Sequence, residues 1–160
     1  MNPPAADGPA AVTVSPEAFL AMGREILAKQ PFSVLLGTEV AALEPGRCEL
    51  QLAIVPQLTQ HHGFAHGGVL CYLADNALTY AGGTALRVPV VSSEFQISYV
   101  RPAIGGRLIA RAHAVHVGRT QAVCRCDVFV LVDGVEKLCA MAQGTIVRLP
   151  DARPGQGSAP

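Results

Sequence analysis

The chain has 160 residues, of which half are hydrophobic and 15% are charged, and its twelve basic and twelve acidic side chains cancel. This balance argues against nucleic acid as a partner, because nucleic-acid-binding domains carry basic surfaces. The sequence has no run of about 18 apolar residues, so neither a transmembrane helix nor a membrane partner is expected. So apolar a composition favours a homo-oligomer with buried interfaces, either a dimer or a tetramer of dimers.

The five cysteines lack the spacing of a zinc site, and the N-terminus lacks the basic and apolar regions of a secretory signal. Together these features predict a cytoplasmic protein with reduced thiols. Residues 1–14 and 150–160 are rich in Ala, Pro and Gly and are expected to be disordered tails. Between them, residues 15–149 are predicted to form a single domain.

The first predicted element is a helix that begins after Ser15. Ser15 is a good N-cap, Pro16 suits the first helical position, and the helix is expected to end near Lys29. An extended piece over 34–43 is predicted next. It is followed by a strand over 48–54, where apolar and more polar residues alternate.

A central helix is predicted in a segment that is almost free of charge. Asp75 is the only charged residue between Pro56 and Leu86, and the helix that contains it is apolar on nearly every side. A charged side chain is rarely buried without a partner, because an isolated carboxylate loses many kcal/mol when it leaves water. Gly67 and Gly68 open this helix, where free N–H groups favour an anion. A lone carboxylate and an anion-stabilising helix start together predict an active site.

The rest of the domain is predicted to be β-structure. An Asp-Gly pair at 133–134 between two apolar stretches is a strong signal for a type I′ hairpin. The expected strands form an antiparallel meander over 90–100, 107–117, 121–132 and 135–149. A helix that is apolar all round needs cover on every side. We therefore predict an α+β fold in which a curved antiparallel sheet wraps around the central helix.

Two stretches of the sequence resemble a known family. G-F-A-H-G-G-V-L-x-x-L-A-D-N-A at 63–77 and S-E-F-Q-I-S-Y-V-R-P-A at 93–103 are similar to motifs of the hotdog-fold acyl-CoA thioesterases of the phenylacetate-degradation type. The turn V-G-R-T at 117–120 extends the resemblance, which covers about residues 32–148. The resemblance implies a hotdog fold and the hydrolysis of an acyl-CoA thioester by water.

The resemblance also implies catalytic roles. Asp75 would act as general base or nucleophile, and the Gly67 N–H would point at the thioester oxygen. His66 would shape the loop or help to bind the thioester. Ser92 or Ser93 would hold the attacking water. Neighbours on a strand face opposite sides, so only one serine is expected to reach the site, and Ser92 is slightly preferred.

A wider group of residues is predicted to bind the substrate. Gln60 stands where family members often carry Asn, and Arg101 and Arg119 are candidates for the coenzyme A phosphates, although each arginine could simply be solvated. The full set of predicted binding residues is Gln60, His62, Gly68, Asn76, Arg101 and Arg119. No cofactor is expected beyond the coenzyme A of the substrate. No metal is expected either, because the histidines at 61, 62 and 66 lack carboxylate or thiolate partners.

Other interpretations stay open at this point. Asp75 could be a structural carboxylate, and the same fold could serve an acyl-thioester hydratase or dehydratase, or a non-catalytic acyl-CoA-binding protein. If the protein is a thioesterase, each site is expected to be shared by two chains. Gly67 and Asp75 are eight residues apart, about 12 Å along one helix, whereas a base must lie within about 3 Å of its proton or reach it through one water. Two helices antiparallel across a two-fold axis would solve this problem.

Overall fold

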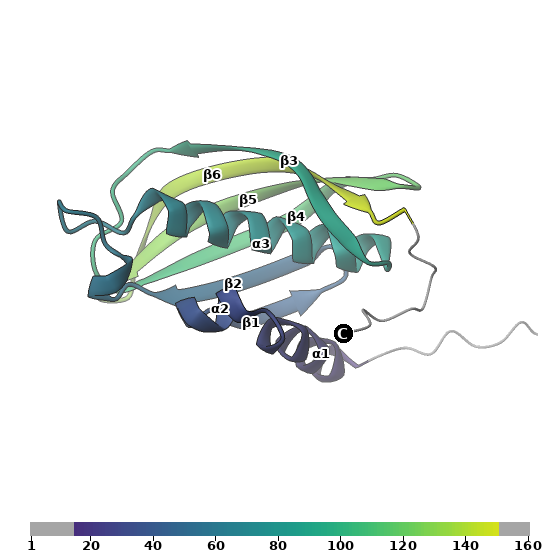
Figure 1. The fold of residues 1–160 in the computed structure, drawn as a ribbon, viewed down its shortest axis with the longest axis horizontal. Helices are drawn as coiled ribbons and strands as arrows, with labels where there is room; N and C mark the ends of the chain where they lie inside the picture. The colour runs from purple at the N-terminus through teal and green to yellow at the C-terminus, as the bar shows by residue number, and fades with distance from the viewer. Residues whose placement is uncertain (1–14, 151–160) are drawn as a thin grey trace, which may run out of the picture.

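The computed structural model describes residues 15–150, so the predicted tails, apart from Pro150, lie outside the described residues. In chain order the elements are α1 (Pro16–Ala28), α2 (Pro31–Leu36), β1 (Glu39–Glu44), β2 (Arg47–Ala53), the 3-10 helix η1 (Pro56–Leu58), α3 (Gly67–Leu86), β3 (Val90–Tyr99), β4 (Arg107–Val117), β5 (Gln121–Val132) and β6 (Val135–Arg148). The strands form one curved antiparallel sheet, and α3 lies along its inner face (Figure 1). The predicted α+β architecture is confirmed.

The order of the strands corrects one prediction. The sheet runs β1-β2-β4-β5-β6-β3, so β4, β5 and β6 form the expected meander but β3 pairs with β6 at the far edge. Tight turns force β4 to β6 to be neighbours, and Asp133 and Gly134 both have positive φ, as a type I′ turn requires. The link from β3 to β4 has no such turn. Cys139 of β6 anchors its start, because its carbonyl accepts from the amides of Val100 and Arg101.

The predicted extended piece over 34–43 is wrong in its first part. Pro31 starts the short helix α2, and Gly37 ends it in the left-handed conformation with φ 71°. The strand β1 begins only at Glu39. The helix α1 agrees with the sequence, since the Ser15 hydroxyl accepts a hydrogen bond from the Ala18 amide at 3.2 Å.

Small residues allow α3 to lie close to the sheet and β3 to lie close to β6. A Cβ at Gly82 would lie 2.5 Å from the Cβ of Ile146, and one at Gly144 would lie 2.6 Å from the Cβ of Phe95. No side chain fits at such distances, so both positions require glycine. The surrounding layer of the core is also made of small residues, namely Ala74, Ala77 and Ala81 of α3 and Ala110, Ala112, Ala122, Cys124, Cys126, Ala140 and Ala142 of the sheet.

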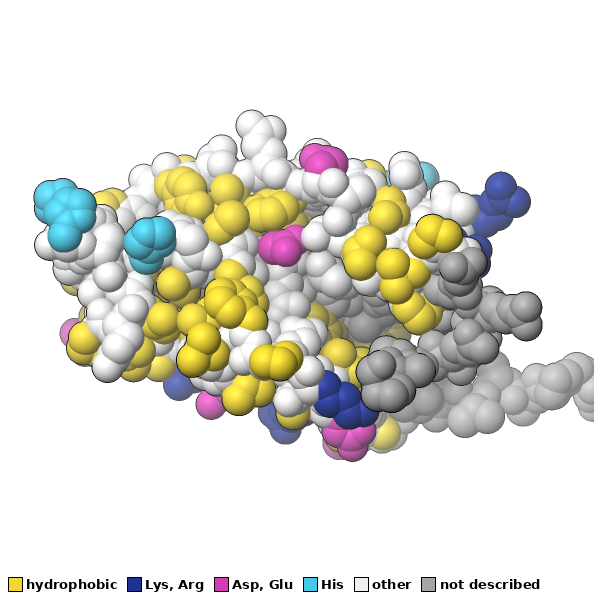
Figure 2. Space-filling view, in the orientation of Figure 1, with side chains coloured by type: hydrophobic (Ala, Val, Ile, Leu, Met, Phe, Trp, Pro, Cys, Tyr) yellow, Lys and Arg dark blue, Asp and Glu magenta, His cyan; other side chains and the backbone are white. Residues whose placement is uncertain are grey.

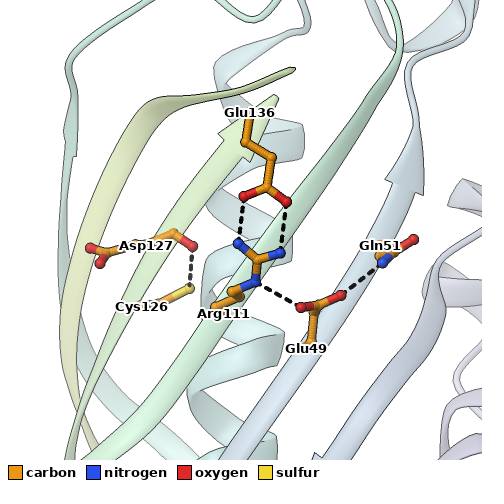
Figure 3. Close-up of polar contacts among 6 residues, drawn as sticks. All are labelled: Glu49, Gln51, Arg111, Cys126, Asp127 and Glu136. Carbon is orange, nitrogen blue, oxygen red and sulfur yellow. Dashed lines mark hydrogen bonds and ion pairs between the residues drawn. The ribbon is translucent and has the colours of Figure 1, made fainter. Parts of the chain in front are cut away.

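The outer face of the sheet carries an ion-pair network (Figure 3). Arg111 of β4 donates to both carboxylate oxygens of Glu136 at 2.6 and 2.8 Å, and its Nε donates to Glu49 at 2.7 Å. Gln51 donates to the other oxygen of Glu49. The hydrogen bonds from Arg111 hold the pKa of Glu136 below its usual value. The carboxylate of Glu49 is thus held by Gln51 of its own strand and by Arg111 of the adjacent strand β4, and Arg111 reaches across β5 to Glu136 of β6.

Candidate active site

The first turn of α3 leaves the Gly67 amide without an acceptor among the described residues. His66 is the N-cap residue, and its Nδ1 accepts a hydrogen bond from the Gly68 amide at 2.9 Å. The Val69 amide donates to the His66 carbonyl. Within the described part of the chain, the Gly67 amide donates no hydrogen bond. The helix start therefore offers the Gly67 N–H, at the positive end of the helix dipole, to a ligand.

Tyr99 covers this helix start and was not predicted as a site residue, although it lies inside the second sequence motif. Its hydroxyl donates to the Gly67 carbonyl at 3.0 Å, and its ring lies 3.5 Å from where a Cβ of Gly67 would be. Burial, followed by the nearby Cys71 thiol, raises the pKa of the Tyr99 hydroxyl. Tyr99 comes from the end of β3, so its contact with Gly67 depends on a pairing that the sequence does not reveal.

Asp75 lies on the face of α3 that points away from the sheet. Half-buried residues follow one another along this face at helical spacing, namely Cys71, Asp75, Thr79 and Gly83, whereas Leu73, Ala74, Ala77 and Leu78 on the opposite face are fully buried. The prediction of a helix that is apolar on nearly every side is therefore too simple. The outward face carries the polar side chains of Asp75 and Thr79, and Asp75 as a residue is half-buried rather than fully buried.

The Asp75 carboxylate nevertheless has a buried atom without a partner. Its Oδ1 is shielded from solvent and forms no hydrogen bond with any residue between 15 and 150. The Thr79 hydroxyl, one turn further on, donates to the Asp75 backbone carbonyl at 2.9 Å and not to the carboxylate. A buried acceptor left without a donor costs roughly 1–3 kcal/mol. Such an atom calls for an explanation, and a ligand is one.

Asn76, a predicted binding residue, connects α3 to α2. Its side-chain nitrogen donates to the Tyr72 hydroxyl at 3.2 Å and to Gln30 Oε1 at 3.3 Å. The Tyr72 hydroxyl in turn donates to Ser33 at 2.7 Å. This network fixes α2 next to the residue that follows Asp75. Substrate binding by Asn76 stays a prediction.

A β-bulge separates the two candidate serines. Ser92 pairs with Ile146 and Glu94 pairs with Thr145, so Ser93 is an extra residue without a cross-strand partner. Ser92 is half-buried, whereas Ser93 is exposed and its hydroxyl donates to the Thr145 carbonyl at 3.1 Å. The two side chains thus have different surroundings, but the bulge breaks the simple alternation on which the prediction of opposite faces depended, and which serine reaches the site stays a prediction.

The remaining candidates lie at two places. Gln60 and His62 belong to the loop before α3, where Gln60 Oε1 accepts from the His62 amide at 3.3 Å. Arg101 and Arg119 lie near opposite ends of β6, because the Arg101 amide donates to Cys139 while the Arg148 amide donates to Thr120. Nine residues of strand separate these contacts, about 30 Å. One chain therefore does not bring both arginines to the same phosphate.

Gly67 and Asp75 are likewise apart within one chain. They lie on one straight helix, eight residues and about 12 Å from each other. No group of three or more His, Cys, Asp or Glu side chains between residues 15 and 150 is arranged to hold a metal ion. None of the helices in this part of the chain combines the length and the hydrophobicity needed to cross a membrane.

Comparison with known proteins identifies the family. A model of the thioesterase superfamily matches residues 62–137. A protein of Saccharolobus solfataricus with esterase in its name is 30% identical over 77% of this chain and 81% of its own length. The acyl-coenzyme A thioesterase PaaI of Escherichia coli is 28% identical over 71% of this chain and 79% of its own length.

Among solved structures, a mutant of the phenylacetic acid degradation protein PaaI from Thermus thermophilus is 37% identical to this chain. The match covers 75% of this chain and all of that one, with a TM-score of 0.67. The resemblance seen in the sequence motifs and the predicted hotdog fold are both confirmed. The chain belongs to the thioesterase superfamily, as a PaaI-like hotdog thioesterase.

Proposed function

We propose that this hydrolase acts on acyl-CoA thioesters, with Asp75 as the catalytic carboxylate and the Gly67 N–H as the donor to the thioester oxygen. The observation that carries the proposal is the buried Oδ1 of Asp75, which lacks a hydrogen bond within the described residues, on the open face of α3. The name of the Escherichia coli relative supports acyl-CoA as the substrate.

In the proposed reaction, Asp75 takes a proton from water as the water oxygen attacks the thioester carbon. Alternatively, the carboxylate attacks directly and water then hydrolyses the anhydride. Negative charge develops on the carbonyl oxygen, where the Gly67 N–H contributes roughly 3 kcal/mol without reorganisation. The carbon–sulfur bond breaks, and the coenzyme A thiolate receives a proton, giving the free acid and the thiol.

We further propose that each site is built from two chains. β3 lies at the edge of the sheet, and the outer side of this ten-residue strand, which faces away from β6, is a template for a second strand. If two copies meet along this edge, their α3 helices run antiparallel, and Gly67 of one copy approaches Asp75 of the other. An isologous contact of this kind creates two equivalent sites.

A thiol-release assay tests the activity. The purified protein, given acetyl-, octanoyl-, dodecanoyl-, hexadecanoyl- and phenylacetyl-CoA, should release free thiol from at least one of them, and dialysis against a chelator should leave the rate unchanged. No thiol release from any of these substrates would contradict the proposal. Consumption of an enoyl-CoA without thiol release would instead support a hydratase.

A heterodimer tests the shared site. Asp75→Asn and Gly67→Pro chains carry different tags, are co-expressed and are purified as the mixed dimer. One composite site then carries both lesions and the other carries neither, so about half of the wild-type activity should return. A mixed dimer that folds but stays inactive would place each site within a single chain.

A further inference from the structure

An elongated cavity lies between α1 and the second half of α3. It has a volume of about 530 Å³, and its wall on the α1 side consists of Phe19, Met22 and Ile26. Thr79 and Gly83 line the α3 side. Figure 2 shows a hollow on this face, flanked by hydrophobic side chains.

The cavity begins next to the proposed catalytic carboxylate. Asn76 follows Asp75 directly, Thr79 lies one turn beyond it, and both residues line the cavity. From Asn76 to Gly83 the wall extends about 10 Å along the helix axis. It continues past the end of α3 to Val88 and Val90. The cavity therefore leads away from Asp75 along the helix.

The polar side chains on the α3 side of the cavity, namely Asn76, Thr79, Tyr80 and Thr84, already form hydrogen bonds within the protein. The Asn76 amide is engaged with Gln30 and Tyr72, and the Thr79 hydroxyl with a backbone carbonyl, so neither polar group is left over inside the cavity. Arg87, the one charged residue in the described lining, is exposed beyond the end of α3. A charged or strongly polar ligand would find no hydrogen-bond partner deep inside the cavity. An apolar chain needs no such partner, and its removal from water favours binding.

The described residues leave the α1 wall of the cavity partly uncovered. Met22 and Ile26 keep 43% and 41% of their surface exposed, although they belong to the apolar face of the helix. Only Gly23 and Leu27 of α1 are buried, and the Tyr80 hydroxyl holds the helix through the Gly23 carbonyl at 3.0 Å. An apolar wall that is exposed and continuous with the site is what a ligand with an apolar tail requires.

We infer that this cavity holds the acyl chain of the substrate, and that the preferred acyl group is a straight chain of medium length. The inference depends on the proposed function for its thioester. The long axis of the cavity favours a linear chain over a compact aromatic group. The side chains at 22 and 26 of α1 then limit the length of chain that the site accepts.

A fluorescence experiment tests occupancy without any need for catalysis. The chain contains no tryptophan, so a single introduced tryptophan is a clean reporter. In Met22→Trp, dodecanoic acid should shift the emission to shorter wavelength in a saturable manner. Ala21→Trp places the same residue on the exposed side of α1, outside the cavity lining, and its emission should not change.

A kinetic experiment tests the link to the substrate. Ile26→Trp narrows the cavity and should lower kcat/KM for dodecanoyl-CoA at least tenfold relative to acetyl-CoA, whereas Ala21→Trp should keep the wild-type ratio. An unchanged ratio in Ile26→Trp, or equal emission changes in both reporters, would overturn the inference. If the wild type releases no thiol from any acyl-CoA while Met22→Trp responds to dodecanoic acid, the proposed function fails but the apolar-chain site stands.

Discussion

The carboxylates on the two sides of this molecule have opposite surroundings. On the outer face of the sheet, Glu49 and Glu136 are held by Arg111 at 2.6 to 2.8 Å. On the open face of α3, Asp75 has a buried oxygen with no hydrogen bond in the described structure. Asp127 of the sheet also has a buried Oδ1 without a hydrogen bond, but the Arg125 Nε lies 3.7 Å from it.

This difference separates the carboxylates that Arg111 holds in the folded state from Asp75, the carboxylate proposed for catalysis. A paired carboxylate already has its favourable interactions, and protonating it or removing it costs stability. A shielded carboxylate without a partner lowers stability, and a fold retains it only for another reason. The comparison predicts that substitutions on the two faces affect different measurable quantities.

The largest expected effect is on catalysis. Asp75→Asn keeps the size of the side chain but removes the base, so kcat should fall by at least about a hundredfold, as is usual for a positioned acid or base. The melting temperature should stay the same or rise, because the variant no longer shields an unpaired charge. Thiol release and thermal unfolding followed by circular dichroism measure the two quantities. An early-melting variant with near-normal kcat would assign Asp75 to the structural carboxylates.

A smaller effect is expected at the bulge of β3. Ser92→Ala should lower kcat several-fold if the half-buried hydroxyl holds the attacking water. Ser93→Ala should have almost no effect on kcat, because that hydroxyl is exposed and bound to the Thr145 carbonyl. Each variant is the matched control of the other in the same assay. Equal effects on kcat from the two substitutions would show that neither serine has a specific role in holding the attacking water.

On the outer face the expected effect is on stability alone. Arg111→Met removes the cation from both Glu49 and Glu136 while keeping an aliphatic stem over the sheet. We expect a loss of about 1 kcal/mol in the free energy of unfolding, the upper end for a partly exposed network. Urea denaturation measures this loss, and kcat should remain that of the wild type. A lower kcat in folded Arg111→Met would contradict the expectation that the outer face of the sheet affects stability but not catalysis.

The smallest effect concerns pH. The hydrogen bonds from Arg111 lower the pKa of Glu136 from its ordinary value of 4.5, so the folded state favours the charged form. Its contribution to stability is present above pH 4.5 and is lost as the pH falls through the lowered pKa. Wild type should exceed Glu136→Gln by a few tenths of a kcal/mol at pH 7, after solvent screening, and this difference should disappear in acid. A difference that grows on acidification would contradict the assignment.

Local patterns in the sequence identified most of the fold. The predicted strands over 107–117 and 121–132 agree with β4 and β5 at both ends, because alternation and short turns act between near neighbours. The pairing of β3 with β6 was not predictable in the same way. It joins segments about fifty residues apart, and the intervening chain contains no signal that excludes the simple meander.

The candidate site also combines local features, which the sequence reveals, with long-range contacts, which it does not. The motifs singled out Gly67 and Asp75 as candidates, because a glycine helix start and a lone carboxylate are visible in one stretch of sequence, and their catalytic roles stay predictions. The contact of Tyr99 with Gly67 and the bulge at Ser93 depend on long-range register, which a single sequence does not fix. The short helix α2 escaped prediction because six residues are too few to show a helical period.

The contacts at Gly82 and Gly144 have a consequence for how such a protein evolves. Any side chain at Gly82 would push α3 away from the sheet, and any side chain at Gly144 would push β3 away from β6, so we expect substitutions in this layer to destabilise the fold. The exposed side of α1 is under no such constraint, since only two of its residues are buried. Mutation can therefore accumulate on α1 while the frame that carries Gly67 and Asp75 remains unchanged, and new preferences can arise without loss of an existing activity.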